Sequence, residues 1–528
     1  DSEEGAGSGD DNEQSDSGDD SSDDSSDDSS SNDSDTSGDS GSGGSTNGGG
    51  NSSDDDSSGD SAGNDDGSDD SDQDNEAGQD DDSSFWSEAE PSADTRVIYV
   101  SSSEGNDSNS GFSENDPVLT LEKAKSRMRD GFPDRMLLKR GDFWNEGFGT
   151  WVLSGRSENE PMIIGAYGSG TQRPHLQPSE HCIYLVGGLR HLWITSLRIT
   201  GVEGTNNGAG VWMHCSGNDG EDLLLEDLYV SGFDPNIALS AVEHQFRFEN
   251  LRIRGVVSVD AVRWGDDGIP TSSASTQGLY LNHIDGALIE RCVFDHNGRS
   301  HDPNIETAGM HCHNVYCQVQ TENIVVRDSI FANAGSHGMK LLAGGSVEGC
   351  LFLKNPLGLL CGIEYAAPGV GTVSTIRNNV ILDSQPINSS MPRGYGIELQ
   401  NCKDTVVQDN IVAHMKTQAY GAGVSLVIND KNVCDNVNII DNYVLDWVGT
   451  AMKVHLYDSQ DYDLKIKRNH FEGRLEAGVG ESFVLGLNEA ELASEIKFEG
   501  NTYYVDSVPV FSYVGSDWWT YAQWKAYS

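Results

Sequence analysis

One short motif recurs along the chain and constrains its fold more than any other feature. The pattern is an apolar residue, any residue, an apolar residue, two polar or small residues, a ladder residue, any residue and an apolar residue. Individual copies depart from it at one or two positions. The copies are WITSLRI (193–199), LLEDLYV (224–230), FRFENLRI (246–253), LIERCVF (288–294), VVRDSIF (325–331), SVEGCLF (346–352), TIRNNVI (375–381), VVQDNIV (406–412), NIIDNYV (438–444), KIKRNHF (465–471) and IKFEGNTY (496–503). Successive copies are 21 to 41 residues apart, which indicates a fixed core that loops of different length leave.

A second apolar segment, usually opened by glycine, accompanies the motif, as in GLYLN (278–282), GMKLL (338–342) and GIELQ (396–400). Two or three short strands per unit cannot close a sheet alone, but stacked units form a solenoid of parallel strands about 4.8 Å apart. The ladder residues are Leu197, Leu228, Leu251, Cys292, Ser329, Cys350, Asn379, Asn410, Asn442, Asn469 and Asn501. Asparagine tolerates a left-handed bend, and stacked asparagines hydrogen-bond along a column. The repeat therefore predicts an all-β, parallel β-helix solenoid.

The segment VIYVSSSEGNDSNSGFSENDPVLTLEKA (97–124) places a strand, a polar turn and the start of a helix before the repeats. Residues 117–130 are helix-like with Gly131 as the stop, and such a helix would cap the open strand edges. The aromatic residues of 516–528 should cap the far end. With these features the chain resembles the right-handed parallel β-helix proteins of the pectate-lyase-like superfamily over residues 96–528. The resemblance implies a right-handed β-helix and leaves the activity open, because this fold hosts lyases, hydrolases, isomerases and adhesins.

Residues 1–94 differ from the rest of the chain in composition and charge. They contain 33 Asp or Glu and no Lys or Arg, with almost no apolar residue before Phe85 and Trp86. Such a segment cannot bury enough surface to offset its chain entropy, so we expect a disordered acidic spacer ahead of one β-helix domain at 95–528. The spacer resembles those that follow the export signals of bacterial surface lipoproteins. We expect a secreted or surface-tethered protein whose leader has been removed and which has no membrane-spanning segment.

The nine cysteines show no CxxC or zinc-binding spacing. Cys402 and Cys434 each lie eight residues before a ladder asparagine. They should therefore stack in consecutive coils, where a disulfide could form. Cys292 and Cys350 hold ladder positions two coils apart, about 9.6 Å, which is too far for a disulfide.

Side chains alternate across a strand, so the outward positions follow from the repeats. Tyr280, Tyr316 and Lys340 fall in one outward column on three neighbouring coils, and Glu398 lies in that column two coils beyond Lys340. Extra loops on a solenoid usually wall a groove on one side. The two longest intervals contain the loops 264–277 and 295–308 and flank these coils.

Basic and imidazole side chains gather in the same region. His311 and His313 are expected to face outward, His337 precedes a glycine at a bend, and Arg263 and Arg299 lie in or beside the two loops. Residues 95–528 carry 53 acidic and 33 basic residues, a net charge of −20. A local reversal of charge suits an anionic sugar chain. We therefore predict an acidic polysaccharide as partner, no nucleic acid, and a monomeric protein.

The resemblance implies β-elimination on a uronic-acid polysaccharide, for which a base, an acid and a cation are needed. We assign Lys340 or His313 as the base and Tyr316 as the acid, with His311 as a further catalytic candidate. The expected substrate-binding residues are Arg263, Arg299, Tyr280, His337 and Glu398. Calcium often assists in such lyases, and the oxygen ligands available in the long loop are Asp302, Asn304 and Glu306.

Other interpretations stay open. A glycoside hydrolase of the polygalacturonase type needs two carboxylates, which WGDDG could supply as Asp266 and Asp267. A non-catalytic, glycan-binding or adhesin-like surface solenoid would fit the acidic spacer. Tyr280 could simply pack under a loop, His311, His313 and His337 could anchor loops or turns, and Trp212 is expected to cover a loop.

Overall fold

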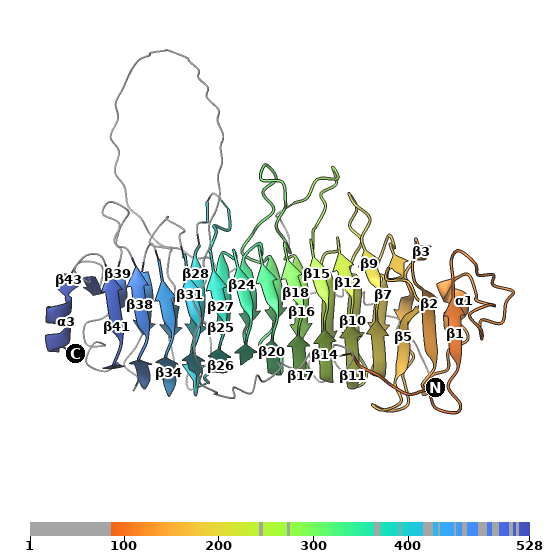
Figure 1. Cartoon of the computed structure of the whole chain (residues 1–528), viewed down its shortest axis with the longest axis horizontal. Helices are drawn as coiled ribbons and strands as arrows, with labels where there is room; N and C mark the ends of the chain where they lie inside the picture. The colour runs from red at the N-terminus through yellow and green to blue at the C-terminus, as the bar shows by residue number, and fades with distance from the viewer. Residues whose placement is uncertain are drawn as a thin grey trace, which may run out of the picture. The chain divides into compact units, whose positions relative to one another are not determined.

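The computed structural model describes residues 86–241, 246–271, 275–363, 370–388, 390–391, 393–415, 426–430, 433–447, 450–456, 462–473, 483–487, 496–505, 510–513 and 517–527. Three long sheets, named A, B and C here, run side by side through these residues, and Figure 1 shows their strands stacked in chain order. Each coil contributes one strand to each sheet in turn, and successive coils pair in parallel, as Leu288 with Val325 in sheet A and Tyr280 with Tyr316 in sheet C. This register confirms the predicted parallel β-helix.

Sheet A consists of β1 (Val97–Val100), β2 (Arg135–Lys139), β5 (Met162–Tyr167), β8 (Arg190–Thr195), β11 (Gly220–Glu226), β14 (Phe248–Arg254), β17 (Ile284–Glu290), β20 (Glu322–Arg327), β23 (Gly344–Glu348), β26 (Val373–Arg377), β30 (Val406–Gln408), β34 (Val437–Ile440), β37 (Leu464–Lys467) and β40 (Lys497–Glu499). Sheet B consists of β3 (Phe143–Trp144), β6 (His175–Leu176), β9 (Arg198–Thr200), β12 (Tyr229–Ser231), β15 (Val257–Val259), β18 (Val293–Asp295), β21 (Ile330–Ala332), β24 (Leu351–Leu353), β27 (Val380–Leu382), β31 (Ile411–Ala413), β35 (Tyr443–Leu445), β38 (His470–Gly473) and β41 (Thr502–Val505).

Sheet C consists of β4 (Gly149–Trp151), β7 (Ile183–Val186), β10 (Val211–Cys215), β13 (Ile237–Ala241), β16 (Gln277–Asn282), β19 (His313–Cys317), β22 (His337–Leu341), β25 (Leu357–Gly362), β28 (Tyr395–Gln400), β32 (Leu426–Asp430), β36 (Thr450–Leu456), β39 (Phe483–Leu487), β42 (Val510–Tyr513) and β43 (Asp517–Thr520). A short fourth pair joins β29 (Cys402–Lys403) to β33 (Cys434–Asp435). Sheets A, B and C begin with β1, β3 and β4, so coils exist before residue 193 that the sequence motif did not reveal.

The core fills the interior of the coils. Inward residues of all three sheets are buried in one continuous apolar cluster. Within it Phe331 stacks between Phe294 and Phe352, with ring centroids 5.4 and 4.9 Å apart, because the three residues are register partners in sheet B. Burying each such ring contributes roughly 1.5–3 kcal/mol, so identical inward positions repeated along the coils stabilise the solenoid.

The asparagine ladder is confirmed. In each step the backbone N–H and Nδ2 of one asparagine donate to Oδ1 of the next, as from Asn379 to Asn410 at 3.0 and 3.0 Å. The steps continue through Asn442 and Asn469 to Asn501. The left-handed bend, however, belongs to the residue before each ladder residue, such as Asn378 (φ 56°) and Asp409 (φ 53°). The ladder side chain itself points inward.

One ladder position was assigned wrongly from the sequence. Leu251 pairs with Leu223 and Ala287 in the middle of sheet A, four residues before the bend at Gly255. The true ladder residue of that coil is Val256, which is fully buried and lies between Leu228 and Cys292 through the bonds Val257 N–H to Leu228 O and Val293 N–H to Val256 O. The error arose because Leu251 in β14 and Val256 just after that strand both follow apolar residues at about the spacing of the motif.

Both ends of the described solenoid carry a helix. Helix α1 spans only Leu121–Lys125, shorter than the predicted 117–130, and it is capped by Thr120, whose side chain accepts from Lys123 N–H. Val118 pairs with β1 through Ser101 N–H to Val118 O, which holds the residues before Thr120 extended. At the other end α3 (Tyr521–Tyr527) buries Trp524, whose ring meets that of Phe498 in β40 at 5.1 Å. None of the helices in the described ranges is long and apolar enough to cross a membrane.

Residues 1–85 of the predicted spacer lie outside the described residues. Residues 86–94, which we had placed in the spacer, instead lie against the solenoid. Ser87 donates its backbone N–H and its hydroxyl to the buried Glu226 of β11 at 2.9–3.1 Å. The guanidinium of Arg135 donates to the carbonyl of Ala89, and Asp94 pairs with Arg156 at 2.5 Å. Few apolar residues mark this segment, so composition alone does not reveal its contacts.

Cys402 and Cys434 are register partners in β29 and β33, so they stack as predicted. Both are present as buried thiols, so the disulfide that this stacking would allow is not formed in the structure. The Sγ of Cys402 instead lies 3.8 Å from the carbonyl of Gln400 and 3.9 Å from that of Cys361.

Candidate functional site

The predicted outward column exists on the outer face of sheet C. Tyr280 pairs with Tyr316, Tyr316 with Lys340, Lys340 with Leu360, and Leu360 with Glu398. Because neighbouring strands are about 4.8 Å apart, Glu398 lies two strands, about 9.6 Å, beyond Lys340. Strand register thus brings together side chains that span more than 100 residues of sequence. Their chemical roles stay predictions.

Tyr316 lies at the centre of this face. Its ring meets that of Tyr280 edge-on at 5.7 Å, and the Nζ of Lys340 lies 5.2 Å from its centroid on the other side. Burial lowers the pKa of Lys340, and the carboxylate of Glu398 opposes that change. A half-buried lysine with a lowered pKa holds more of its neutral, basic form near neutral pH than an exposed lysine does.

His313 and His337 also leave sheet C outward, but both are almost completely buried. Their rings meet at 4.9 Å, the ring of His313 also meets that of Tyr316 at 5.2 Å, and the hydroxyl of Ser336 lies 3.0 Å from His337 Nδ1. Burial, reinforced by the charge of Lys340, holds the pKa of both imidazoles well below the ordinary value. His313 is therefore shielded from solvent with its ring against that of Tyr316, and its role as a base stays a prediction.

The loops beside this face are joined by Arg299. Its Nε donates to Ala334 O, and its Nη2 donates to Pro386 O and Ile387 O at 2.9–3.2 Å. Ala308, Leu357 and Ile387 form a separate buried apolar cluster between the two loops. Burial lowers the pKa of Arg299 to about 10. The guanidinium thus donates to backbone carbonyls of the chain, and its role in holding a substrate stays a prediction.

Arg263 and His311 are the exposed members of the predicted set. Arg263 is half-exposed, and its Nη1 lies 3.9 Å from the carboxylate of Asp234. His311 has an exposed side chain, while its carbonyl accepts from Nε2 of Gln277. Both stay candidates for contact with a ligand.

Two of the three candidate calcium ligands, Asp302 and Asn304, are hydrogen-bonded to each other. Asp302 and Asn304 are exposed, and Asp302 Oδ1 accepts from the backbone N–H and Nδ2 of Asn304 at 2.9 and 2.8 Å. This is a local turn in which the backbone N–H and the amide of the asparagine donate to the carboxylate. Glu306 is an exposed residue of the same loop.

The alternative residues are also placed. Asp266 and Asp267 are exposed in the turn closed by the Trp264–Pro270 bridge, where Asp267 Oδ1 accepts from Ile269 N–H. Trp212 is half-buried, and its ring meets those of His181 at 4.3 Å and Tyr184 at 5.3 Å. The aspartates therefore shape a turn, and Trp212 belongs to an aromatic cluster at the earlier coils of the same column.

Sequence reasoning missed three groups on this face. Arg393 hydrogen-bonds the Tyr395 hydroxyl and adds a positive charge close to His337. Lys453 continues the column through β32, two strands beyond Glu398. Burial lowers the pKa of Lys453, and the carboxylate of Glu398 raises it by a smaller amount. Burial and then Lys453 lower the pKa of His455 to about 4. The segment AMKVHL repeats the Met–Lys pair of GMKLL, which was the available signal.

The comparisons with known proteins concern the fold. No family model and no curated protein matches the sequence. Similar solved structures include the GH136 lacto-N-biosidase from Eubacterium ramulus, at 14% identity over 76% of this chain and 68% of that chain, with a TM-score of 0.39. The A-module of the Azotobacter vinelandii mannuronan C-5 epimerase AlgE4 is 15% identical over 72% and 90%, with a TM-score of 0.36. The alginate lyase of Paenibacillus sp. str. FPU-7 is 12% identical over 80% and 98%, with a TM-score of 0.30.

These likenesses are remote, and the strand register carries the assignment. The chain is a parallel β-helix protein, which is the fold that we expected from the sequence repeats.

Proposed function

We propose that the face of sheet C around Tyr316 and Lys340 binds an acidic polysaccharide and cleaves it by β-elimination. The observation that supports this most directly is the contact of the Lys340 ammonium with the Tyr316 ring, on a lysine whose pKa is lowered by burial. Syn elimination uses a base and an acid on one side of the sugar ring, and these two side chains are register neighbours.

The proposed step begins with neutral Lys340. Its Nζ takes the proton from the sugar carbon that carries the carboxylate. The electron pair forms a carbon–carbon double bond, and the neighbouring carbon–oxygen bond to the next sugar breaks. The Tyr316 hydroxyl donates its proton to that leaving oxygen. A proton then passes from Lys340 to the Tyr316 phenolate, which restores both groups.

Positive charge on this face supports an anionic substrate. Lys340, Arg393 and Lys453 lie around Glu398 in an acidic domain. The carboxylate of Glu398 can balance one of these three charges, so a substrate carboxylate would meet a net positive charge on this face. Among the described register positions of this column, Glu398 is the one carboxylate. Hydrolysis, which needs a pair of carboxylates, is therefore the weaker candidate.

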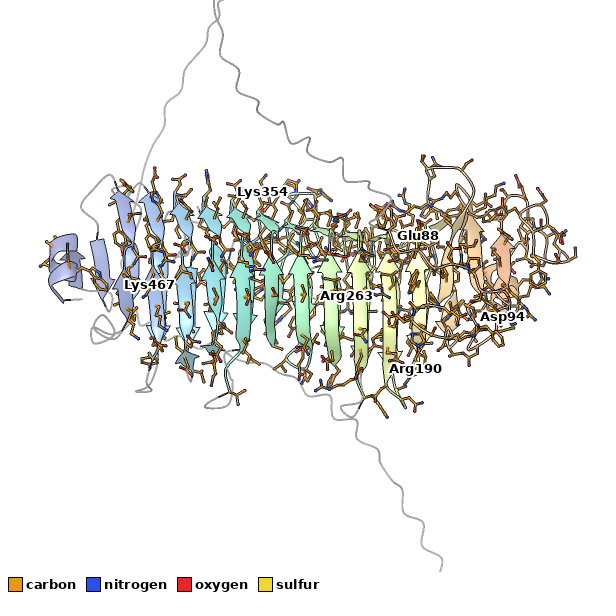
Figure 2. All side chains as sticks on the ribbon, turned by 60° about the horizontal axis from the view of Figure 1, so that its bottom comes forward. Glu88, Asp94, Arg190, Arg263, Lys354 and Lys467 are labelled. Carbon is orange, nitrogen blue, oxygen red and sulfur yellow. The ribbon has the colours of Figure 1, made fainter. Side chains whose placement is uncertain are left out.

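The test uses the full chain with alginate, pectate, chondroitin and dermatan. Elimination leaves a double bond that absorbs near about 235 nm, so we expect absorbance to rise with a substrate of this class. Lys340→Ala and Tyr316→Phe should each reduce the rate about 100-fold or more, as expected when a catalytic acid or base is lost. Lys467→Ala is the matched control, because Lys467 lies on sheet A and pairs with Glu499 (Figure 2).

Other results would reassign the face. New reducing ends without absorbance would indicate hydrolysis. Binding without either product would indicate a glycan-binding solenoid, and activity unchanged in both variants would refute the assigned residues. Because such polysaccharides are extracellular, we also propose that the protein is secreted or tethered at the cell surface through residues 1–94. Fractionation of cells expressing it would contradict this if the protein stayed in the cytosol.

A further inference from the structure

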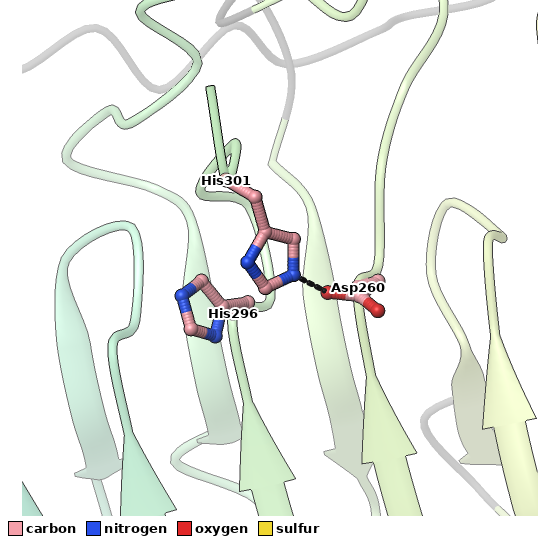
Figure 3. Close-up of side chains that lie close together, drawn as sticks. All are labelled: Asp260, His296 and His301. Carbon is pink, nitrogen blue, oxygen red and sulfur yellow. Dashed lines mark hydrogen bonds and ion pairs between the residues drawn. The ribbon is translucent and has the colours of Figure 1, made fainter. Parts of the chain in front are cut away.

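We propose that Asp260, His296 and His301 form a binding site for a divalent transition-metal ion of the zinc class. One ligand atom of each residue lies within 4.8 Å of those of the other two, and Figure 3 shows the three side chains facing one another. Two imidazoles and one carboxylate form a set that zinc, copper and nickel ions favour and that calcium, which prefers oxygen alone, does not. The site is separate from Tyr316 and Lys340 and does not depend on the proposed elimination.

The fold brings the first two ligands together. Val259 of β15 and Asp295 of β18 are register partners, so Asp260 and His296 follow equivalent positions in successive coils. Both have left-handed backbones, with φ of 53° and 54°, at the bend where the chain leaves sheet B. The two side chains therefore leave neighbouring bends about one strand spacing apart.

The third ligand returns from the loop between β18 and β19. Ser300 N–H donates to Thr307 Oγ1 at 2.7 Å, and Thr307 Oγ1 donates to Gly298 O at 3.2 Å, which closes the base of this loop. His301 lies just beyond that closure, with its Nε2 at 2.7 Å from Asp260 Oδ1. Its ring stacks on that of His296 with centroids 3.9 Å apart.

An outer contact fits the same interpretation. The carboxylate of Asp295 lies 2.8 Å from His296 Nδ1 and accepts from Asn333 Nδ2 at 2.9 Å. If Nε2 of His296 binds the ion, Asp295 is positioned to hold the ring at Nδ1, as carboxylates do for many metal-binding histidines. The charges of Asp260 and Asp295 would balance a divalent cation.

A bound ion would tie the loop to two coils. The same loop carries Arg299, which bonds the carbonyls of Pro386 and Ile387, and Ala308, which packs in the apolar cluster above sheet C. The ion would thus fix one wall of the face that holds Tyr316. Three protein ligands near the surface would leave further coordination positions to water.

The first test uses Cu²⁺ and electron paramagnetic resonance on the full chain. Nitrogen ligands split the Cu²⁺ signal, whereas carboxylate oxygens do not, so the acidic residues 1–94 cannot imitate the site. Millimolar Ca²⁺ is added to occupy those carboxylates. We expect coupling to two nitrogens in the wild type and to one in His301→Ala, with displacement of the ion by Zn²⁺ and not by further Ca²⁺.

Calorimetric titration with Zn²⁺ gives the second readout. We expect one equivalent that binds about 100-fold more weakly in His301→Ala and about 10-fold more weakly in Asp295→Asn. The matched control is His470→Ala, because His470 also lies 3.1 Å from a carboxylate, that of Glu472, at a distance from the loop. His301 is exposed in its loop, so its replacement should not disturb folding, which circular dichroism checks. Unchanged Zn²⁺ affinity in His301→Ala, or a Cu²⁺ signal without nitrogen coupling, would overturn the proposal.

Discussion

Replacing Asn410 with alanine should be among the most destabilising single changes in the described core. Asn410 is fully buried, and its side chain takes part in four hydrogen bonds. It donates to Ile376 O and Asn442 Oδ1 and accepts from the backbone N–H and Nδ2 of Asn379. At about 1 kcal/mol net for each bond, and more where a buried partner is left unsatisfied, the loss should be about 4 kcal/mol.

Two variants calibrate that estimate. Ser329 occupies the same column and accepts from Cys292 N–H at 3.1 Å, so Asn410→Ser should keep an acceptor and lose about half as much. Asn501, the last residue of the ladder, is only half-buried, and water can replace its partners, so Asn501→Ala should cost about 1 kcal/mol.

The assay is denaturant unfolding of the full chain, together with hydrogen exchange of the backbone N–H groups of Asn379 and Asn442. Exchange is needed because stacked repeats can open locally before the whole chain unfolds. In Asn410→Ala, we expect faster exchange at Asn379, whose N–H loses its acceptor, than at Asn442, whose acceptor Asn469 is intact. A cost below about 1 kcal/mol, or equal costs for Asn410→Ala and Asn501→Ala, would refute the reasoning.

Four further predictions concern other residues of the described structure. The carboxylate of Glu398 raises the pKa of Lys340 against the larger effect of burial, so Glu398→Gln should shift the acidic limb of the pH–rate profile to lower pH; an upward shift would contradict the assigned base. Burial alone would raise the pKa of Glu290. Hydrogen bonds from Arg327 and Arg254 have the larger combined effect and lower this pKa below 4.5. Its stabilisation is therefore complete above the ordinary glutamate pKa and is lost as the pH falls through the lowered value, and a Glu290→Gln variant that melts with an unchanged pH dependence would oppose this. Ser87→Ala should speed proteolysis of residues 86–94, because Glu226 loses one donor; equal cleavage rates would argue against an attached segment. All nine cysteines are buried thiols, so a thiol reagent should label them only after unfolding, and rapid labelling of the native protein would contradict their burial.

The repeat predicted the fold because its signal is local and recurs. The spacing around Asn379 and its successors reports one bend repeated at each coil, and a single side-chain type fixes the hydrogen bonds there. Where the ladder residue is apolar the signal weakens, and Leu251 was chosen over Val256 because both follow apolar neighbours at similar spacing. In the coils before residue 193 the connection from sheet A to sheet B is longer than in the motif, as between Tyr167 of β5 and His175 of β6, so they gave no match.

The site was predicted only in part, for a physical reason. Alternation within a strand gives the direction of a side chain, so the column from Tyr280 to Glu398 could be inferred. The alternation does not show which outward side chains are covered by a loop. His313 and Arg299 face away from the core and are nevertheless enclosed by other segments. Lys453 was missed because AMKVHL does not open with the glycine that marks GLYLN, GMKLL and GIELQ.

The asparagine ladder has a direction, which bears on how the solenoid is assembled. Each asparagine directs its backbone N–H and one Nδ2 hydrogen toward the oxygen of the following coil, while its other Nδ2 hydrogen reaches back, as from Asn379 to Val347 O. A coil that has just emerged during synthesis therefore presents donors that only the next coil can satisfy. Growth from the N-terminus leaves a templating edge at every stage, and the terminal asparagine, Asn501, receives the final pair of bonds.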